Sequence, residues 1–237
     1  MINLKIKICR VVKKMTRLFE DNNMKYEAIV FDLDGTLIDT LDDLMDSVNF
    51  ALAKFGFPSR NLDEIRSFVG NGVKRLVYLS VPEGTDEAIS EKCLEIFKEH
   101  YKGNSQNKTA PYAGIQEMLA KVKAAGFKTA VVTNKIQDAA IEIIRNFFGD
   151  KIDVIIGQID GVAQKPEPDG VWLALEKLGA DRANAVYIGD SEVDCMTAHN
   201  AGLPCIGVTW GFRSREVLEE NNAEFIVDLP EKILDII

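Results

Sequence analysis

The sequence predicts an α/β protein in which helices flank a parallel β-sheet and a small helical domain is inserted after the first strand. Two observations support this. From residue 110 onward, short apolar segments alternate with amphipathic helical patterns, which is typical of a parallel sheet covered on both faces. From residue 41 to residue 109 only helical patterns occur. With 46% hydrophobic residues, the 237-residue chain has enough apolar mass for a sizeable core.

Residues 1–24 differ in composition from the rest of the chain. They carry six basic and two acidic residues, and their apolar residues recur at helical spacing, which indicates a basic amphipathic helix. We expect an extension that precedes a natural start at Met24. A packing or partner helix is the second interpretation, and an anchor on an anionic membrane surface is the third. No apolar stretch is long enough to predict an integral membrane segment.

The first strand is predicted to end at Phe31, where a short apolar segment runs into a turn. Asp32 and Asp34 follow, and Gly35 allows a sharp turn whose N–H groups can face an anion. In an α/β sheet, ligands bind at the carboxyl ends of the strands. An Asx turn that caps the next helix would need only one of the two acids. The pair therefore indicates a functional site.

The inserted helical domain spans residues 41–109, whereas residues 25–40 and 110–237 form the α/β core. An amphipathic helix is predicted from Leu41, and Gly56 and Pro58 end it. Further helices are predicted at 62–68, 73–79 and 88–101, followed by a polar linker at 102–109. The connections at 38–41 and 109–114 are the expected hinges between the two domains.

The second half of the chain has the alternating pattern of a parallel sheet. Strands are predicted at 128–132, 154–156, 185–188, 204–208 and 225–227, and helices at 115–125, 136–147, 169–178, 192–201 and 233–237.

Polar residues also follow three of these later segments. Thr133 and Asn134 end a strand, although a helix N-cap would look the same. Lys165 is followed by Pro166 and Pro168, which can orient a cation on a stiff backbone but are also common in surface loops. Asp190 and Asp194 lie one helical turn apart after an apolar strand, which favours a divalent-cation site.

In this order, FDLDGTL at 31–37, TN at 133–134, QKPEP at 164–168 and YIGDSEVD at 187–194 resemble the four motifs of the haloacid dehalogenase superfamily of phosphohydrolases. The resemblance runs from about Tyr26 to the C-terminus. It implies a Rossmann-like core, a helical cap over the site, and a magnesium-dependent phosphatase that acts on small phosphorylated metabolites.

The resemblance implies that Asp32 is the nucleophile, that Asp34 is the general acid and base, and that Lys165 supports catalysis. An Asp at position 34 separates phosphatases from the dehalogenases and phosphonate-cleaving enzymes of the superfamily. Other residues would bind phosphate or metal. The phosphate ligands would be Gly35, Thr133, Asn134 and Lys165, and the magnesium ligands Asp32, Asp34 and Asp190, with Asp194 in support.

Selectivity is expected to come from the cap, where SFVGNGVKRL spans residues 67–76. Asn71 lies in a tight loop, and Lys74 and Arg75 open the next helix, so these three are candidate substrate ligands, although two solvated basic residues are the simpler interpretation. This loop and VTWGF at 208–212 resemble phosphoglycolate phosphatases. We therefore expect small carboxylated phosphomonoesters as substrates. Pyrophosphatase, sugar phosphatase and β-phosphoglucomutase-like phosphomutase activities are the alternatives, and a non-catalytic binding module has little support.

The net charge of −9 argues against a general nucleic-acid binder. The four cysteines, at 9, 93, 195 and 205, have no C-x-x-C spacing, so we expect free thiols in a reducing, cytoplasmic compartment. The sequence carries no indication of oligomeric state.

Overall fold

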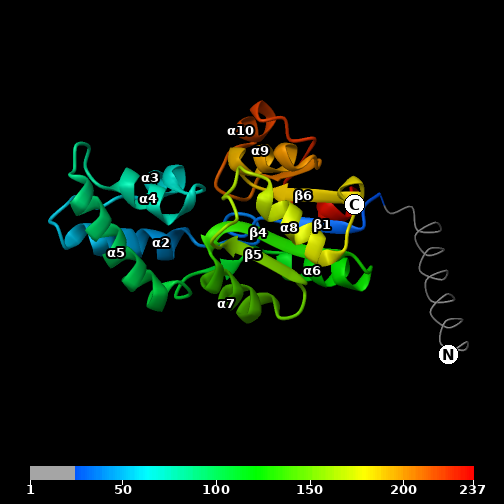
Figure 1. The fold of residues 1–237 in the computed structure, drawn as a ribbon, viewed down its shortest axis with the longest axis horizontal. Coiled ribbons are helices and arrows are strands. Elements are labelled where there is room, and N and C mark those ends of the chain that lie inside the picture. Colours follow the sequence, from blue (N-terminus) through cyan, green and yellow to red (C-terminus); the bar gives the residue numbers. More distant parts are fainter. Residues whose placement is uncertain (1–24) are drawn as a thin grey trace, which may run out of the picture.

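A computed structural model of the protein describes residues 25–237, and Figure 1 shows its arrangement. The extension predicted at 1–24 lies outside the described residues. A six-stranded parallel sheet forms the core, with strand order β5-β4-β1-β6-β7-β8. Its strands are β1 (Ala28–Phe31), β4 (Lys128–Ile136), β5 (Val154–Gln158), β6 (Ala185–Gly189), β7 (Cys205–Val208) and β8 (Phe225–Val227).

Helices cover both faces of the sheet because its central strands are buried on both sides. In β1, Ile29 and Phe31 belong to one apolar cluster and Ala28 and Val30 to the other, and none of these side chains is exposed. The first cluster includes residues of α6 (Ile115–Ala124), α7 (Gln137–Phe148) and the 3-10 helix η2 (Pro230–Asp235). The second includes residues of α8 (Asp169–Leu178), α9 (Glu192–Ala201) and α10 (Arg215–Glu220).

The helical block lies at one end of the molecule, at the left in Figure 1, and we call residues 41–109 the cap. It consists of α2 (Leu41–Ala53), α3 (Leu62–Phe68), α4 (Gly72–Ser80) and α5 (Glu87–Asn104). These helices share an apolar cluster of their own, which Phe212 of the core joins. This separate cluster explains why the block packs as a unit instead of against the sheet.

The two connections between core and cap are paired with each other. β2 (Ile38–Asp39) and β3 (Ala110–Pro111) form a two-stranded antiparallel ribbon. Beside it, the buried Asp43 carboxylate accepts hydrogen bonds from the amides of Lys108 and Thr109 at 2.9–3.1 Å. Both expected hinges therefore lie at one junction; their motion stays a prediction.

The α/β fold class with its helical insertion is confirmed, and several details differ from the sequence-based predictions. α5 extends to Asn104, into the expected polar linker, and β4 continues through Thr133 and Asn134 to Ile136. The helix expected at 233–237 is wrong in place and type: a 3-10 helix begins at Pro230, where the proline starts a tight turn. Two short helices, α10 and η1 (Arg182–Asn184), were not predicted, because they have too few residues for a periodic pattern.

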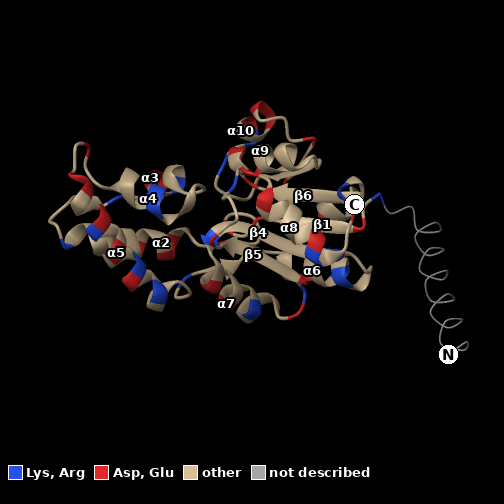
Figure 2. Cartoon of the chain, viewed as in Figure 1, with Lys and Arg blue, Asp and Glu red and all other residues tan. Residues whose placement is uncertain are grey.

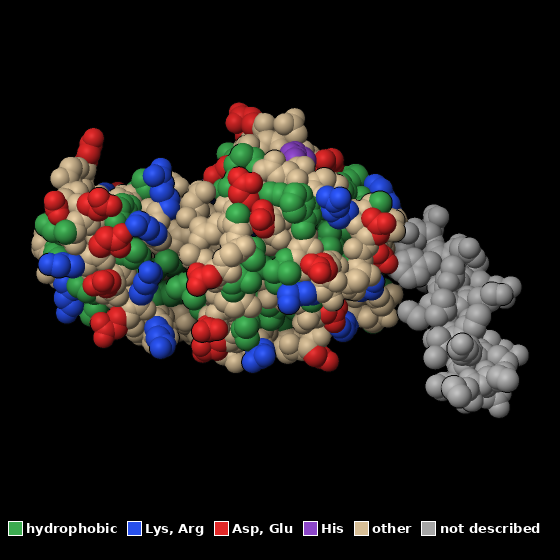
Figure 3. Space-filling model, in the orientation of Figure 1, with side chains coloured by type: hydrophobic (Ala, Val, Ile, Leu, Met, Phe, Trp, Pro, Cys, Tyr) green, Lys and Arg blue, Asp and Glu red, His purple; other side chains and the backbone are tan. Residues whose placement is uncertain are grey.

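The surface carries charges of both signs. Acidic and basic residues both occur along the cap helices in Figure 2, and their side chains are interspersed over the face shown in Figure 3. Across residues 25–237, no helix is both long and apolar enough to cross a bilayer. Cys93, Cys195 and Cys205 are buried free thiols, as expected, and Cys9 lies outside the described residues.

Candidate active site

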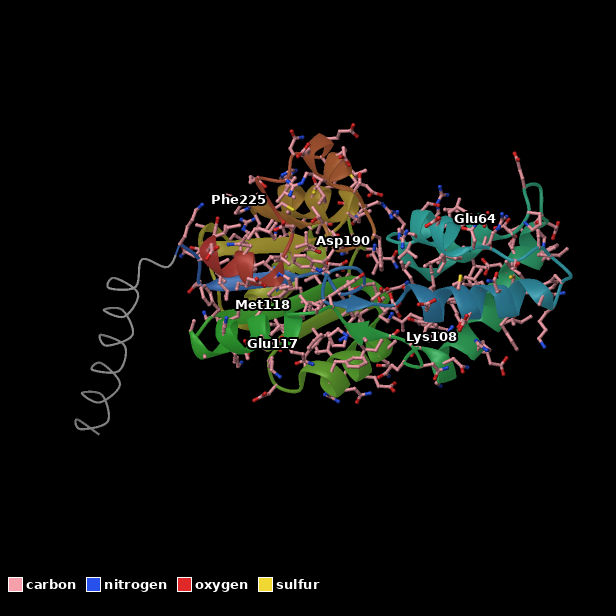
Figure 4. All side chains as sticks on the ribbon, turned by 180° about the vertical axis from the view of Figure 1, so that it is seen from behind. Glu64, Lys108, Glu117, Met118, Asp190 and Phe225 are labelled. Atoms are coloured by element: carbon pink, nitrogen blue, oxygen red, sulfur yellow. The ribbon has the colours of Figure 1, made fainter. Side chains whose placement is uncertain are left out.

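The site lies at the carboxyl ends of the central strands, on the edge of the sheet that faces the cap. Asp32 directly follows β1, Thr133 lies near the end of β4, and Asp190 directly follows β6. Figure 4 shows Asp190 at this edge, between the sheet and the cap helices. Because neighbouring parallel strands end at the same edge, the fold gathers motifs that are more than 150 residues apart, such as Thr36 and Asp190.

Lys165 is the centre of the hydrogen-bond network. Its Nζ atom lies 2.7 Å from Oδ1 of Asp32 and 2.7 Å from Oδ1 of Asp194, and it donates to the Tyr187 hydroxyl at 3.1 Å. The side chain of Asn134 fixes the lysine backbone: Oδ1 accepts from the Lys165 amide at 2.9 Å, and Nδ2 donates to the Lys165 carbonyl at 3.1 Å. Asn134 therefore acts here as a support for Lys165.

Asp194 orders the loop that carries Asp190. Its Oδ2 atom accepts hydrogen bonds from the amides of Asp190 and Ser191, at 3.2 and 3.1 Å, and from the Ser191 hydroxyl at 2.6 Å. The side chain is completely buried. With its other oxygen bound to Lys165, Asp194 joins the lysine to the loop. Its expected support of magnesium binding stays a prediction.

Glycines allow the backbone to approach Asp190 closely. A Cβ atom at Gly35 would lie 2.4 Å from Oδ2 of Asp190, and Gly35 has a φ of +94°, a conformation that favours glycine. Asp190 itself accepts from the Thr36 hydroxyl at 3.1 Å and from the Phe212 amide at 2.7 Å. Unlike Asp32 and Asp194, it has no cationic partner among the described residues.

Asp32, Asp190 and Asp194 form a buried acidic cluster, with carboxylate oxygens within 4.8 Å of one another. Burial, together with the charge of Asp194, raises the pKa of Asp32 to about 7 although Lys165 opposes the shift. Burial and Asp194 also raise the pKa of Asp190 well above its usual range. Three buried carboxylates with one lysine leave negative charge uncompensated, so the donor set fits a magnesium ion.

The carboxylate of Asp34 points to a different partner. Its Oδ1 atom lies 2.9 Å from Nζ of Lys135, which also donates to the hydroxyl of Tyr101 in α5 at 2.8 Å. Asp34 is therefore outside the cluster of three carboxylates. Lys135 was not among the residues predicted from the sequence. The signal was available, since this lysine directly follows Thr133 and Asn134 at the end of a strand.

A cavity of about 60 Å³ lies between core and cap. The core lines it with Asp32, Asp34, Thr133, Asn134, Lys135, Lys165, Asp190, Ser191, Phe212 and Arg213, and the cap with Leu44, Val69, Gly70, Gly72, Val73 and Leu76. The polar wall comes from the core and the apolar wall from the cap. A water needs roughly 10–15 Å³ of such space, so the cavity has room for a small ligand only.

Comparison with known proteins places this constellation in a family. The model of the haloacid dehalogenase-like hydrolases matches residues 29–208, which include all four motifs. The chain belongs to this family. The predicted enzyme class of the chain, a phosphatase of the haloacid dehalogenase superfamily, is confirmed.

Curated relatives of this hydrolase include proteins named phosphoglycolate phosphatase. The one from Mesorhizobium japonicum is 34% identical over 83% of this chain and 88% of its own length. The one from Psychrobacter arcticus is 34% identical over 84% of this chain and 90% of its own length. Among solved structures, a protein from Lactobacillus delbrueckii subsp. bulgaricus is 34% identical, with a TM-score of 0.85 over 90% of this chain and 98% of that one. CbbY from Rhodobacter sphaeroides, solved in complex with phosphate, is 27% identical, with a TM-score of 0.68 over 88% and 96%.

The three cap residues predicted to bind substrate do not line the cavity of this hydrolase. Asn71, Lys74 and Arg75 are exposed. The Lys74 ammonium group pairs with Glu91 at 2.5 Å, and its side chain is 62% exposed. The loop itself borders the cavity through Gly70 and Gly72. A role of these three residues in substrate binding stays a prediction.

Arg213, which directly follows the WGF segment, connects the core to the cap and was also missed from the sequence. Its guanidinium group donates to the carbonyls of Arg66 and Val69, at 2.7 and 2.8 Å, at the C-terminal end of cap helix α3. It also pairs with Glu192 of the core at 2.9 Å. Together with a 3.1 Å bond from Asn134 to the Gly70 carbonyl, these contacts hold the cap against the site.

Proposed function

We propose that the protein is a magnesium-dependent phosphatase that hydrolyses small phosphomonoesters through an aspartyl-phosphate on Asp32. One observation carries this proposal: Asp32 stands at a strand end, paired with Lys165 and clustered with Asp190 and Asp194, and it opens into the cavity beside Asp34. A nucleophile, an acid–base group and a buried cation thus meet around one small space.

In the first half-reaction, an Asp32 oxygen attacks phosphorus in line, forming an oxygen–phosphorus bond while the bond to the ester oxygen breaks. Asp34 gives its proton to the leaving oxygen. In the second half-reaction, Asp34 takes a proton from a water molecule that attacks the acyl phosphate, which releases phosphate and restores Asp32.

Other residues hold the phosphoryl oxygens. Lys165 supplies a buried positive charge. The Gly35 amide donates to the Ile38 carbonyl at 2.9 Å within the turn, so its expected contact with phosphate stays a prediction. The Thr133 hydroxyl accepts from the Lys135 amide at 3.2 Å, which leaves its own proton free to donate to a phosphoryl oxygen. Asp32 and Asp190 would hold magnesium, which when bound supplies positive charge beside the phosphoryl group and lowers the pKa of the nucleophile.

The proposed substrates are small carboxylated phosphomonoesters such as 2-phosphoglycolate. The names of the relatives support this class, and so does the size of the cavity. Pyrophosphate, sugar phosphates and phosphoryl return to a hexose phosphate are the rival outcomes of a substrate screen.

Asp32→Asn tests the mechanism, because it keeps the shape of the side chain and removes the nucleophilic oxygen. Hydrolysis of p-nitrophenyl phosphate in magnesium should fall to background in this variant while magnesium still binds. Asp160→Asn, which changes an exposed loop carboxylate, is the matched control and should keep full activity. If Asp32→Asn keeps the wild-type rate, the covalent mechanism is wrong.

A further inference from the structure

Lys135 is a buried lysine at the wall of the cavity that the proposed chemistry leaves without a task. Its side chain is 5% exposed, and its ammonium group lies between the Asp34 carboxylate of the core and the Tyr101 hydroxyl of the cap. A buried cation at this place is costly unless it is paired. Packing alone therefore does not explain why a lysine is buried at this position.

Among residues 25–237, three cationic side chains line the cavity, and they differ in how many of their N–H groups have a hydrogen-bond partner. Lys165 has a partner for each of its three N–H groups, namely Asp32, Asp194 and Tyr187. Arg213 is directed toward Glu192 and toward two cap carbonyls.

Lys135 is different from these two cations. Within the described part of the chain, its Nζ atom makes two hydrogen bonds, to Asp34 and Tyr101. An ammonium group has three donors, so one donor of Lys135 remains for a ligand. Because Lys135 lines the cavity, that ligand would be part of the substrate.

The position of Lys135 relative to Asp34 shows which part of a substrate it can reach. Asp34 protonates the leaving oxygen, so that oxygen must lie one hydrogen bond away from the Asp34 carboxylate. Lys135 Nζ is 2.9 Å from the same carboxylate. Lys135 is therefore placed on the side of the site where the leaving group must lie. In phosphoglycolate the carboxylate is separated from the leaving oxygen by one carbon, which places it next to this ammonium group.

We propose that Lys135 binds the carboxylate of the leaving group, and that Tyr101 of the cap holds the lysine in place for this task. The inference rests on the proposed phosphatase function and deepens it. It also gives the substrate-binding cation to the core instead of to Lys74 or Arg75 of the cap. A charge-assisted hydrogen bond in a small buried site is stronger than one at the exposed Lys74.

Tyr101 makes the carboxylate site dependent on the cap. It belongs to α5, and its hydroxyl contacts Lys135 at 2.8 Å, with the ammonium group 5.0 Å from the ring centroid. When the cap is closed, Lys135 is thus held by one residue from each domain. Removing the Tyr101 hydroxyl keeps the positive charge of Lys135 but removes one of the two contacts that fix its ammonium group.

The experiment compares kcat/KM on 2-phosphoglycolate with kcat/KM on ethyl phosphate, which has the same chain length and no carboxylate. Lys135→Met keeps the length of the side chain and removes its charge. Both substrates should lose rate, because Lys135 also contacts Asp34. Phosphoglycolate should lose at least about tenfold more, equivalent to about 1.4 kcal/mol. This difference separates carboxylate binding from a merely structural role.

Tyr101→Phe is the second variant, and it tests the proposal even if Lys135→Met does not fold. It should raise KM for phosphoglycolate and leave KM for ethyl phosphate within about twofold, since only the position of Lys135 changes. Lys98→Met, an exposed lysine of the same helix, is the matched control and should change neither substrate.

Two results with the variants would overturn the inference while the phosphatase function stands. One is an equal loss on both substrates in Lys135→Met; the other is a selective loss in Lys74→Met instead. A wild-type protein that hydrolyses ethyl phosphate as well as phosphoglycolate also counts against it. If the wild type hydrolyses neither ester in magnesium, the proposed function itself fails.

Discussion

Replacing Asp194 by asparagine should destabilise the protein strongly. The two oxygens of Asp194 accept five hydrogen bonds: from Lys165 and Tyr187 on one side, and from the amides of Asp190 and Ser191 and the Ser191 hydroxyl on the other. An asparagine can accept on one side only, since its NH₂ group is a donor. In either orientation at least two buried donors lose their acceptor, and the Lys165 charge loses one partner. Such a loss costs about 3–5 kcal/mol.

The measurement is urea unfolding of the EDTA-treated protein, followed by circular dichroism, so that metal binding does not contribute. Asp160→Asn makes the same chemical change at an exposed loop position and should stay within about 0.5 kcal/mol of the wild type. An Asp194→Asn variant as stable as this control would refute the reasoning, because it would mean that the network around Lys165 is not formed.

Three further predictions follow from the same structure. Gly211→Ala should weaken magnesium binding measured by calorimetry, because its Cβ would lie 2.4 Å from the Gly35 carbonyl oxygen and 2.3 Å from Asp190 Cβ, whereas Gly103→Ala, in open space, should not. Arg213→Met should raise KM for small phosphate esters about tenfold or more by releasing the cap, since a lost charged hydrogen bond costs about 1.5–3 kcal/mol. The raised pKa of Asp32, about 7, means that its protonated form stabilises the metal-free fold at low pH and that this contribution is lost as pH rises through 7. Tm in EDTA should therefore fall from about pH 5 to about pH 8, and magnesium should raise Tm more at the higher pH. An unchanged magnesium affinity in Gly211→Ala, an unchanged KM in Arg213→Met or a Tm that does not vary with pH would contradict the respective prediction.

The core of the site could be predicted from sequence because each of its acids is marked by the residues directly before it. Asp32 and Asp190 each follow a short apolar strand, and parallel strands bring their carboxyl ends to one edge. The motif order then suffices to place these acids together. The helical insertion could also be predicted, because residues 41–109 contain only helical patterns and no segment typical of a strand.

The contacts between core and cap could not be predicted in this way. Lys135 meets Tyr101 only because the cap packs over the edge of the sheet, and nothing in the local pattern of α5 or β4 specifies that docking. The direction of Lys74 was equally hidden, since a lysine in the first turn of a helix can point toward a cavity or along the surface. Glu91 of the neighbouring helix decides this, and helix packing is a tertiary property.

The central claim is that phosphate passes through a covalent bond to Asp32. The most direct test mixes the enzyme with magnesium and 2-phosphoglycolate, quenches the reaction in acid within its first turnover, and examines the peptides by mass spectrometry. The account predicts one added phosphoryl group on the peptide that contains Asp32, absent without magnesium and absent in Asp32→Asn. Burst release of phosphate with no phosphorylated peptide, or phosphorylation of another residue, would contradict it.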